Sequence, residues 1–487
     1  MIIWLRRHPL ALWVPLQALL YCWKLALLSP WGDEAGTLLM VRGPLGTLVR
    51  WAAEDVHPPL YYSLLYCWQR LPIGFDFAVQ ARLLSVAFAL AGTVALDRLW
   101  GARLAERTRW LLLALWTLSP CLMLYARMCR SYTLQALCSI VAVAMLVRVA
   151  EEARRRDIVW LTMALLAAMY SHYVAGIALV GMTNLVLLRR GNWRPLLMVE
   201  GGLAIGYLPW IGTLASSLTA WGSNGRSYSL TGSRVLEVPV KFGYWCMSFV
   251  MGEAVPDWVL VAGILLLPLV AIAAWRGARG AGAVAWIALG LSAIGFFGVA
   301  RWVSYPFVPA RMLFVLPLFL LLVVRGSNSR LGRVAIAGML LLSVSGIACY
   351  FNKVGFRNKE YPVPIGEIAG RILRESGAAD SLVLVDNANS DPIAMLYALH
   401  PRRSLLQTGL PGTGDAVARA LEDPRIRTVW FLSNTRDITG LNGKFQAMLG
   451  ARMSERVHSY EAYSGLERWV MGPSAPVYFQ ELVEYRR

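Results

Sequence analysis

Charged residues are scarce in this chain, and lysine is nearly missing. Charged residues make up 16% of the 487 positions, and only five of them are lysines. Soluble domains keep about a quarter of their residues charged, so this composition argues against a chain that is soluble throughout. Hydrophobic residues make up 57% of the sequence and the mean hydropathy is +0.51. Much of the chain therefore needs lipid as its solvent.

Paired cysteines, internal repeats and a basic nucleic-acid face are also missing. The seven cysteines have no paired spacing and none follows Cys349, so neither a disulfide framework nor a zinc site is indicated. The net charge of +18 could suggest nucleic acid. However, most arginines before residue 350 stand at the ends of apolar runs, not in one face interleaved with aromatic residues. No nucleic-acid partner is expected.

The apolar runs predict a multi-pass membrane protein with about eleven spans. Arginine-bearing loops follow alternate runs, and the positive-inside rule places these loops, with the N-terminus, in the cytoplasm. An odd number of spans then places the tail outside. The predicted spans are 9–29, 79–97, 110–125, 132–149, 158–171, 173–188, 196–213, 256–275, 282–300, 307–324 and 333–350.

One of these assignments decides the topology of everything downstream. The stretch from Ile158 to Leu188 could form one long tilted helix, or two short helices separated at Ser171-His172-Tyr173. A single helix would turn the later arginine-rich loops outward, against the charge rule. The charge pattern therefore favours two helices.

The chain divides into a membrane domain, 1–350, and a small α/β domain, 351–487. In the tail, apolar runs at 382–385 and 428–432 are typical of strands, and 365–375 and 415–421 have helical periodicity. The first outer loop, 30–78, is long for a compact membrane protein, and long loops are often functional. It contains two amphipathic stretches, Thr47–Ala53 and Leu60–Leu71, which suit a membrane interface.

The candidate chemistry begins with acids in this loop. Asp33 and Glu34 directly follow the first span, where carboxylates suit a general base or a hard divalent cation. Asp55 and His57 precede two prolines that fix a helix start, a position that favours a phosphate or a metal. The competing readings are a solvated helix end for the acidic pair and a simple helix-start signal for the prolines.

Arginines on the outer side form the second group of candidates. Arg127 and Arg130, followed by Tyr132, lie at the outer end of a span, where the charge rule disfavours them. A lipid-linked phosphate would explain them, because guanidinium binds phosphate bidentately; pairing with acids of the first loop, or snorkelling, is the alternative. His172 and Arg311 are weaker examples on the same face.

Several short motifs, in order, resemble the C-type (GT-C) membrane glycosyltransferases. The resemblance is to bacterial relatives of protein O-mannosyltransferases and lipid A aminoarabinose transferases (glycosyltransferase families 39 and 83), and it covers roughly residues 1–350. The motifs that carry it are Trp31-Gly32-Asp33-Glu34, Asp55-Val56-His57-Pro58-Pro59-Leu60-Tyr61-Tyr62, Ala81-Arg82-Leu83-Leu84-Ser85, Leu118-Ser119-Pro120 through Arg130-Ser131-Tyr132, Tyr170-Ser171-His172-Tyr173 and Pro309-Ala310-Arg311-Met312-Leu313.

The resemblance implies a GT-C fold, a polyprenyl- or dolichyl-phosphate sugar donor, an acidic pair for base or metal duty, and transfer with inversion. Asp33 matches the outer-loop aspartate of the family, and Asp55 with His57 matches the acid and the residue before the double proline. Arg130 and Tyr132 match the arginine and tyrosine after the third span. Many relatives carry Gln-Glu where this chain has Arg127-Met128. A carboxylate is therefore absent at this place, and the resemblance does not decide whether a metal is bound.

The expected function is an inverting glycosyltransferase on the outer face of a bacterial inner membrane. Its donor would be a polyprenyl-phosphate sugar in the membrane lipid, and its acceptor an envelope lipid, glycan or protein. Expected catalytic residues are Asp33, Glu34 and Asp55; expected phosphate ligands are Arg130, Arg127, His57, Tyr132, Arg311 and His172; a divalent cation (Mg²⁺, Mn²⁺ or Zn²⁺) would use Asp33, Asp55 and His57. A transporter or flippase, and a lipid-linked oligosaccharide polymerase or ligase, are the alternatives.

Overall fold

The chain folds into two compact units. The computed structural model describes residues 7–54, 57–224, 234–302, 308–377, 379–386, 392–393, 404–435, 440–473 and 475–487. The first unit comprises 1–25 and 43–355, and the second comprises 26–42 and 356–487. The segment 26–42, which the sequence analysis places in the membrane domain, thus groups with the C-terminal part of the chain.

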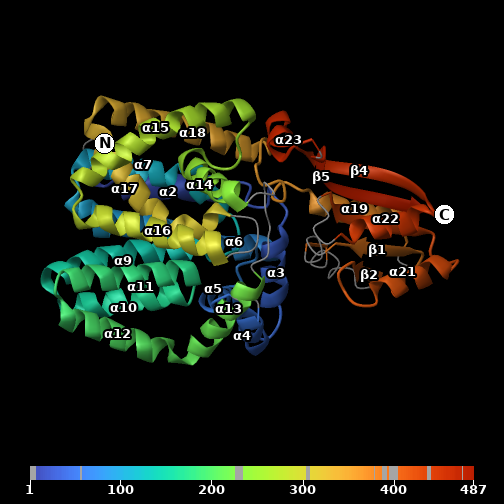
Figure 1. Cartoon of the computed structure of the whole chain (residues 1–487), viewed down its shortest axis with the longest axis horizontal. Coiled ribbons are helices and arrows are strands. Elements are labelled where there is room, and N and C mark those ends of the chain that lie inside the picture. The colour runs from blue at the N-terminus through green and yellow to red at the C-terminus, as the bar shows by residue number, and fades with distance from the viewer. Residues whose placement is uncertain are drawn as a thin grey trace. The chain divides into compact units, whose positions relative to one another are not determined.

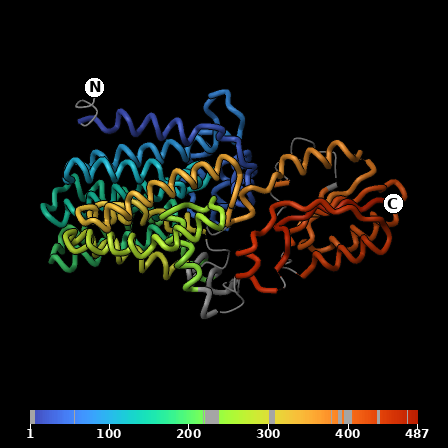
Figure 2. Tube along the Cα trace, turned by 90° about the horizontal axis from the view of Figure 1, so that it is seen from above, coloured from blue at the N-terminus to red at the C-terminus, as the bar shows by residue number. Residues whose placement is uncertain are grey.

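The first unit is built from helices that run roughly alongside one another (Figures 1 and 2). They are α2 (Leu10–Cys22), α4 (Leu45–Glu54), α5 (Leu60–Trp68), α6 (Phe77–Ala95), α7 (Glu106–Thr117), α8 (Pro120–Ala126), α9 (Tyr132–Glu152), α10 (Arg155–Met169), α11 (Tyr173–Arg189), α12 (Trp193–Tyr207), α13 (Ile211–Asn224), α14 (Arg234–Met251), α15 (Asp257–Arg279), α16 (Ala283–Trp302), the 3-10 helix η4 (Pro309–Val315), α17 (Leu316–Arg325) and α18 (Arg330–Phe351).

Each predicted span overlaps helix in this unit, but the predicted span 9–29 extends beyond α2, which ends at Cys22. Within the described residues, six helical segments are long and apolar enough to cross a membrane, and the bent pair α7–α8 would make a seventh. Shorter apolar helices include α2 and α11. The chain is a multi-pass membrane protein, while the total of eleven spans and the side on which each loop lies stay predictions.

Local sequence explains where several helices begin. The Asp76 carboxylate accepts the backbone N–H of Ala78 at 2.9 Å and caps α6. Ser119 caps α8 and is followed by Pro120, which suits the first turn of a helix but interrupts the one before it. The chain accordingly bends by 50° between α7 and α8.

The break at 171–173 is confirmed. α10 ends at Met169 and α11 starts at Tyr173, so the stretch forms two helices that pack against each other (Figure 1). Gly176 makes this packing close, because a Cβ there would lie 2.6 Å from the Met169 Cα. The two amphipathic stretches of the first loop are also helical, as α4 and α5. α14 was not expected, because it lies between the predicted spans 196–213 and 256–275.

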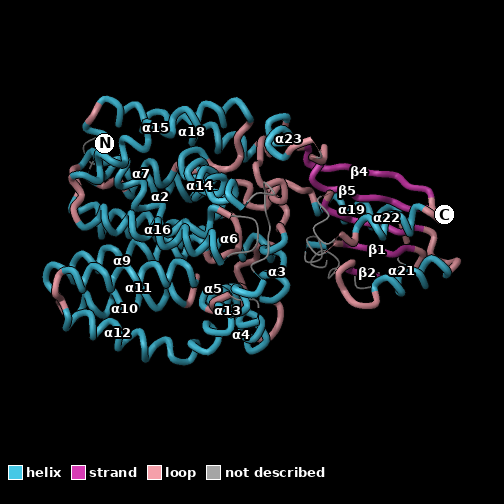
Figure 3. Tube along the Cα trace, viewed as in Figure 1, coloured by secondary structure: helices cyan, strands magenta, loops and turns pink. Residues whose placement is uncertain are grey.

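Among the described residues, the strands all lie in the second unit (Figure 3). Its helices are α3 (Gly32–Val41), α19 (Ile365–Glu375), α21 (Thr413–Glu422), α22 (Asn442–Gly450) and α23 (Gly465–Met471), and its strands are β1 (Ser381–Val385), β2 (Ser404–Gln407), β3 (Thr428–Asn434), β4 (Ser454–Ala462) and β5 (Tyr478–Arg486). The strand order is β2-β1-β3-β5-β4. β2, β1 and β3 are parallel, and β5 is antiparallel to both β3 and β4.

Two apolar clusters form the core of the second unit. β1 and β3 are buried along their whole length, so the side chains of alternate residues pack on opposite faces of the sheet. Ile368 and Ile372 of α19 pack on one face, and Val417 of α21 with Leu449 of α22 pack on the other. The small C-terminal α/β domain predicted from the sequence is therefore present.

Candidate functional site

Helix starts in the first unit carry most of the predicted phosphate ligands. His57 precedes α5, Arg130 precedes α9, His172 precedes α11, and Arg311 lies in the first turn of η4. The N-terminus of a helix presents unsatisfied N–H groups and a partial positive charge, so it favours anions. Prolines at 58–59 and 309 set the backbone at two of these starts.

Hydrogen bonds tie these starts together. The N–H of Leu60 in α5 donates to the carbonyl of Tyr170 at the end of α10, over 2.9 Å. The Gln135 side chain of α9 donates to the carbonyl of Ala310 in η4, over 2.7 Å. Figure 1 shows α5 at the end of the α9, α10 and α11 bundle where this contact occurs. The four basic residues are thus held by connected backbone segments.

Two buried side-chain hydroxyl groups hold the backbone of Arg130 in place. The Tyr61 and Ser85 hydroxyls lie 2.8 Å apart, and the Ser85 hydroxyl donates to the Arg130 carbonyl over 3.2 Å. Thr133 in turn donates to the Ser85 carbonyl over 2.9 Å. Ser85 therefore joins α5, α6 and the start of α9. These contacts explain why a serine suits the last position of the motif Ala81–Ser85.

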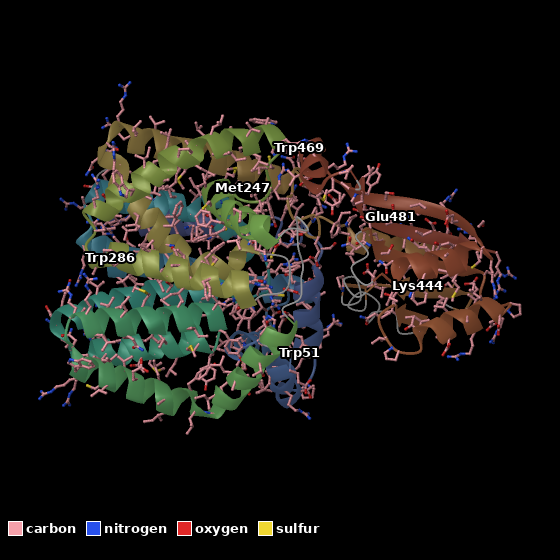
Figure 4. The ribbon with its side chains drawn as sticks, viewed as in Figure 1. Trp51, Met247, Trp286, Lys444, Trp469 and Glu481 are labelled. Atoms are coloured by element: carbon pink, nitrogen blue, oxygen red, sulfur yellow. The ribbon has the colours of Figure 1, made fainter. Side chains whose placement is uncertain are left out.

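The Arg130 guanidinium meets the His57 ring. Their Nη2 and Nε2 atoms are 2.9 Å apart. Because guanidinium can only donate, the His57 Nε2 must accept, which leaves the ring proton on Nδ1. The His57 ring stacks on Trp51, a residue of α4 that Figure 4 labels, and the two rings of His57 and Tyr62 meet at a right angle. Arg130 itself is only 4% exposed, so its position is well defined.

His172 shares the electrostatic environment of this cluster. Burial, together with the positive charges of Arg311 and Arg130 and the nearby His57 ring, lowers the pKa of His172 to about 3. The ring is therefore neutral at physiological pH. Its Nδ1 accepts the N–H of Ala175 at 3.4 Å and caps α11, so its proton resides on Nε2 and can be donated to another group.

Arg311 has an unused donor. Its Nη1 atom is buried and has no hydrogen-bond partner among the residues that the structure describes. A buried, unpaired guanidinium nitrogen is costly unless an anion or another acceptor meets it. We call Arg130, His57, His172 and Arg311 the basic cluster.

Arg127 donates its hydrogen bonds to the end of α2 and not to the basic cluster. Arg127 Nη1 donates to the carbonyls of Tyr21 at 2.6 Å and Trp23 at 2.8 Å, and Nη2 donates to that of Lys24 at 2.6 Å. These carbonyls end α2, where helices lack intrahelical donors and favour a cation. The contacts favour a structural role for Arg127 over phosphate binding. The buried Tyr132 ring packs edge-on against Tyr125.

The first acidic pair belongs to the second unit. Asp33 and Glu34 occupy the first turn of α3, where their charges suit the helix N-terminus. Asp33 is exposed, whereas Glu34 is fully buried. Of the two, Asp33 is the acid that a substrate could reach.

Glu360 holds this helix start in place. The N–H of Gly32 donates to Glu360 Oε1 over 3.3 Å, and the Trp31 and Tyr361 rings pack edge to face with centroids 5.2 Å apart. Burial and the negative charges of Asp33 and Asp386 raise the pKa of Glu360 to about 8. Glu360 is thus protonated at neutral pH, as happens when a carboxyl group is buried near other acids.

The catalytic role of Asp55 and the metal site both stay predictions. Asp55 lies outside the described residues. Among those that are described, no three His, Cys, Asp or Glu side chains are grouped to hold a metal ion, and the lone pair of His57 Nε2 already faces Arg130. Metal dependence stays a prediction that chelation can check.

The overall structure is similar to that of ArnT from Cupriavidus metallidurans. The crystal structure of ArnT in the apo state matches with a TM-score of 0.56 and 13% identity over 97% of each chain. ArnT bound to undecaprenyl phosphate matches with a TM-score of 0.54 and 15% identity, again over 97% of each chain. The chain has the GT-C fold. No protein-family model matches the sequence, and no curated protein does.

The GT-C fold that the short motifs implied is confirmed. Sequence reasoning found all four members of the basic cluster but missed Glu360 and Asp386. A signal for Glu360 was present in Glu360-Tyr-Pro-Val-Pro364, an acid followed by prolines just after the last span. That is the same kind of pattern that singled out His57-Pro-Pro. For Asp386, only its place at the end of a predicted strand was visible.

Proposed function

We propose that this chain is an inverting glycosyltransferase that moves a sugar from a polyprenyl-phosphate-linked donor to an acceptor on the outer face of the bacterial inner membrane. The acceptor is an envelope lipid, glycan or protein. The basic cluster is the observation that carries the proposal, because it combines two guanidinium groups and two imidazoles at helix starts. The GT-C fold supports it, and the ArnT crystal structure that contains undecaprenyl phosphate suggests the class of lipid.

The basic cluster fits the charge that such a reaction creates. When the bond between the anomeric carbon and the phosphate oxygen breaks, negative charge grows on the departing lipid phosphate. Arg130 and the buried Nη1 of Arg311 supply fixed positive charge, and the neutral His172 can donate from Nε2. Donors held in place before the reaction stabilise such charge without reorganisation. Loss of one such donor typically lowers the rate by about 10²–10³.

Asp33 is the proposed general base. The acceptor hydroxyl attacks the anomeric carbon from the face opposite the phosphate, which inverts the configuration, and its proton passes to the Asp33 carboxylate. The exposure of Asp33 supports this role, and the burial of Glu34 favours a supporting one. A general base contributes roughly 10²–10⁴ in rate. Asp55, beyond the described residues, is retained as a second candidate.

Two substitutions separate binding from chemistry. We expect Arg130→Ala to weaken binding of undecaprenyl phosphate and to lower transfer at least about 100-fold. We expect Asp33→Asn to keep that binding and to lower transfer by a similar factor. Binding is measured by tryptophan fluorescence in detergent, and transfer by mass spectrometry of envelope glycans and lipids from cells that produce each variant.

Arg107→Ala serves as the control, because Arg107 is an exposed arginine of α7. Normal transfer by Arg130→Ala at normal expression would remove the phosphate assignment. Uptake or lipid translocation in vesicles without any sugar transfer would favour the transporter alternative. A donor that carries many sugars would instead indicate a polymerase or ligase.

A further inference from the structure

The second unit contains a cavity of its own, lined by both polar and apolar groups. Its volume is about 600 Å³, within the usual range for small-ligand sites. β3 contributes Asn434, α22 contributes Asn442 and Gln446, and β5 contributes Tyr478 and Glu481. None of these residues belongs to the proposed catalytic or phosphate-binding set.

The cavity lies where α/β sheets commonly bind ligands. Asn434 ends β3, and the register pairs it with Gln480 near the start of the antiparallel β5. Ligands of α/β sheets commonly bind outside the carboxyl ends of the parallel strands.

Asn442 points to a missing hydrogen-bond donor. The residue is only 5% exposed, and its Nδ2 donates to the Asn434 carbonyl over 3.4 Å. Its Oδ1 is buried and has no partner among the described residues. An unsatisfied buried carbonyl oxygen costs about 1–3 kcal/mol, and a ligand hydroxyl would satisfy it.

The lining selects a neutral polyol over an anion. The described lining residues offer amides, hydroxyls and the carboxylate of Glu481, and they include no lysine, arginine or histidine. A phosphate would meet no cation there and would be repelled by Glu481. A sugar has hydroxyl groups that donate to carboxylate and amide oxygens, and an apolar face that can contact the partly exposed Tyr478 ring.

Asp386 links the cavity to the surroundings of the proposed base. Asp386 follows β1, and its Oδ2 accepts the N–H of Asn434 over 2.6 Å. The charge of Asp386 also acts on Glu360, together with that of Asp33. These groups all belong to the second unit, so a ligand held near Asn434 is carried by the same body as Asp33.

We propose that this cavity binds a sugar residue of the acceptor, so that the acceptor is a glycan or a molecule that carries one. The identification of this ligand as the acceptor rests on the proposed function, whereas the binding of a sugar by the cavity does not. The cavity then serves as a subsite that holds the acceptor on the unit that supplies the base.

Binding is tested on the full-length protein in lipid nanodiscs. The probes are methyl α-D-mannopyranoside, methyl β-D-glucopyranoside and methyl β-D-galactopyranoside, observed by saturation-transfer NMR. We expect saturation of at least one glycoside and a loss of affinity of about fivefold in Gln446→Leu, the value for one lost hydrogen bond. Glu481→Gln should act in the same direction, because its carboxylate is a stronger acceptor than an amide.

Lys444→Gln is the matched control, since Lys444 is an exposed residue of the same helix α22 that does not line the cavity; Figure 4 marks it together with Glu481. It should bind the glycoside as the wild type does. If no glycoside is saturated, or if Gln446→Leu and Glu481→Gln bind as tightly as the control, the cavity proposal is overturned.

The same samples distinguish failure of the two proposals. Undecaprenyl phosphate should bind equally to the wild type and Gln446→Leu, and more weakly to Arg130→Ala. Glycoside binding with no effect of Arg130→Ala on the lipid would overturn the proposed donor site and leave the cavity standing. The reverse pattern would overturn the cavity alone.

Discussion

Two arginines three positions apart have different surroundings. Arg127 and Arg130 look alike in the sequence, since both lie at the disfavoured end of a span. In the structure Arg127 donates to the last carbonyls of α2 and, through Nε, to the Tyr350 hydroxyl at 2.9 Å, whereas Arg130 reaches His57. A guanidinium has five donors in a fixed plane, so it can serve as a helix cap as well as an anion ligand.

The structural role of Arg127 leads to a stability prediction. We expect Arg127→Ala to lower the free energy of unfolding by roughly 2–5 kcal/mol, because it leaves several buried carbonyls without donors. The measurement is the thermal unfolding midpoint of detergent-solubilised protein, with Arg107→Ala as control. A variant that melts like the wild type yet fails to bind undecaprenyl phosphate would return Arg127 to the phosphate site.

At the scale of elements, the α10–α11 turn positions His172. α11 begins directly after this residue, and the close approach of Gly176 to Met169 sets how tightly the two helices pack. The turn also receives the hydrogen bond from Leu60 at the start of α5. Separation of α10 from α11 would therefore move one member of the basic cluster relative to the others.

We expect Gly176→Ala to destabilise the protein by about 1–3 kcal/mol, the usual cost of overpacking. It should also weaken binding of undecaprenyl phosphate. Gly181→Ala, on the same helix, is the matched control: its Cβ would meet only the Ile294 side chain at 3.8 Å. Thermal unfolding and lipid titration of both variants provide the measurement. Equal behaviour of the two alanine variants would contradict the proposed positioning.

At the scale of the whole molecule, the second unit is discontinuous in sequence. The segment 26–42 lies between membrane helices in the chain but packs with 356–487. Gly32, Trp31 and Ser29 make the contacts, to Glu360, Tyr361 and the N–H of Gly366 respectively. The carboxylate proposed as base is thus carried by a unit whose other residues come more than three hundred positions later.

This junction should make stability depend on pH. The raised pKa of Glu360, about 8 in the folded protein against 4.5 ordinarily, means that the folded state holds a proton that the unfolded state releases between these values. The contribution of this proton to the free energy of unfolding is complete below pH 4.5 and is lost as the pH rises to about 8. We expect Glu360→Gln to show a smaller fall of the unfolding midpoint between pH 5 and 8 than the wild type.

Glu367→Gln, an exposed acid of α19, is the control and should follow the wild-type profile. Glutamine keeps an acceptor for the Gly32 N–H and cannot titrate, so the comparison isolates the proton. An identical pH profile for Glu360→Gln and the wild type would show that Glu360 does not hold that proton.

The sequence alone determined the membrane class, the helical nature of the predicted spans, the split at 171–173 and the α/β character of the tail. These features follow from local signals: apolar runs as long as a bilayer, prolines at helix starts, and the periods of helix and strand. The four residues of the basic cluster were found in the same way, because charged or polar groups at the disfavoured ends of apolar runs stand out locally.

Tertiary structure decided the contacts between distant segments. Only the fold shows that Arg127 caps α2, that Ser85 supports Arg130, and that the segment with Asp33 joins the C-terminal unit through Glu360. Likewise, Asn442 faces a cavity because β3, β5 and α22 meet there. Hydrogen bonds and burial of this kind depend on which elements become neighbours. A periodicity or motif within one segment does not indicate which distant segment will pack against it.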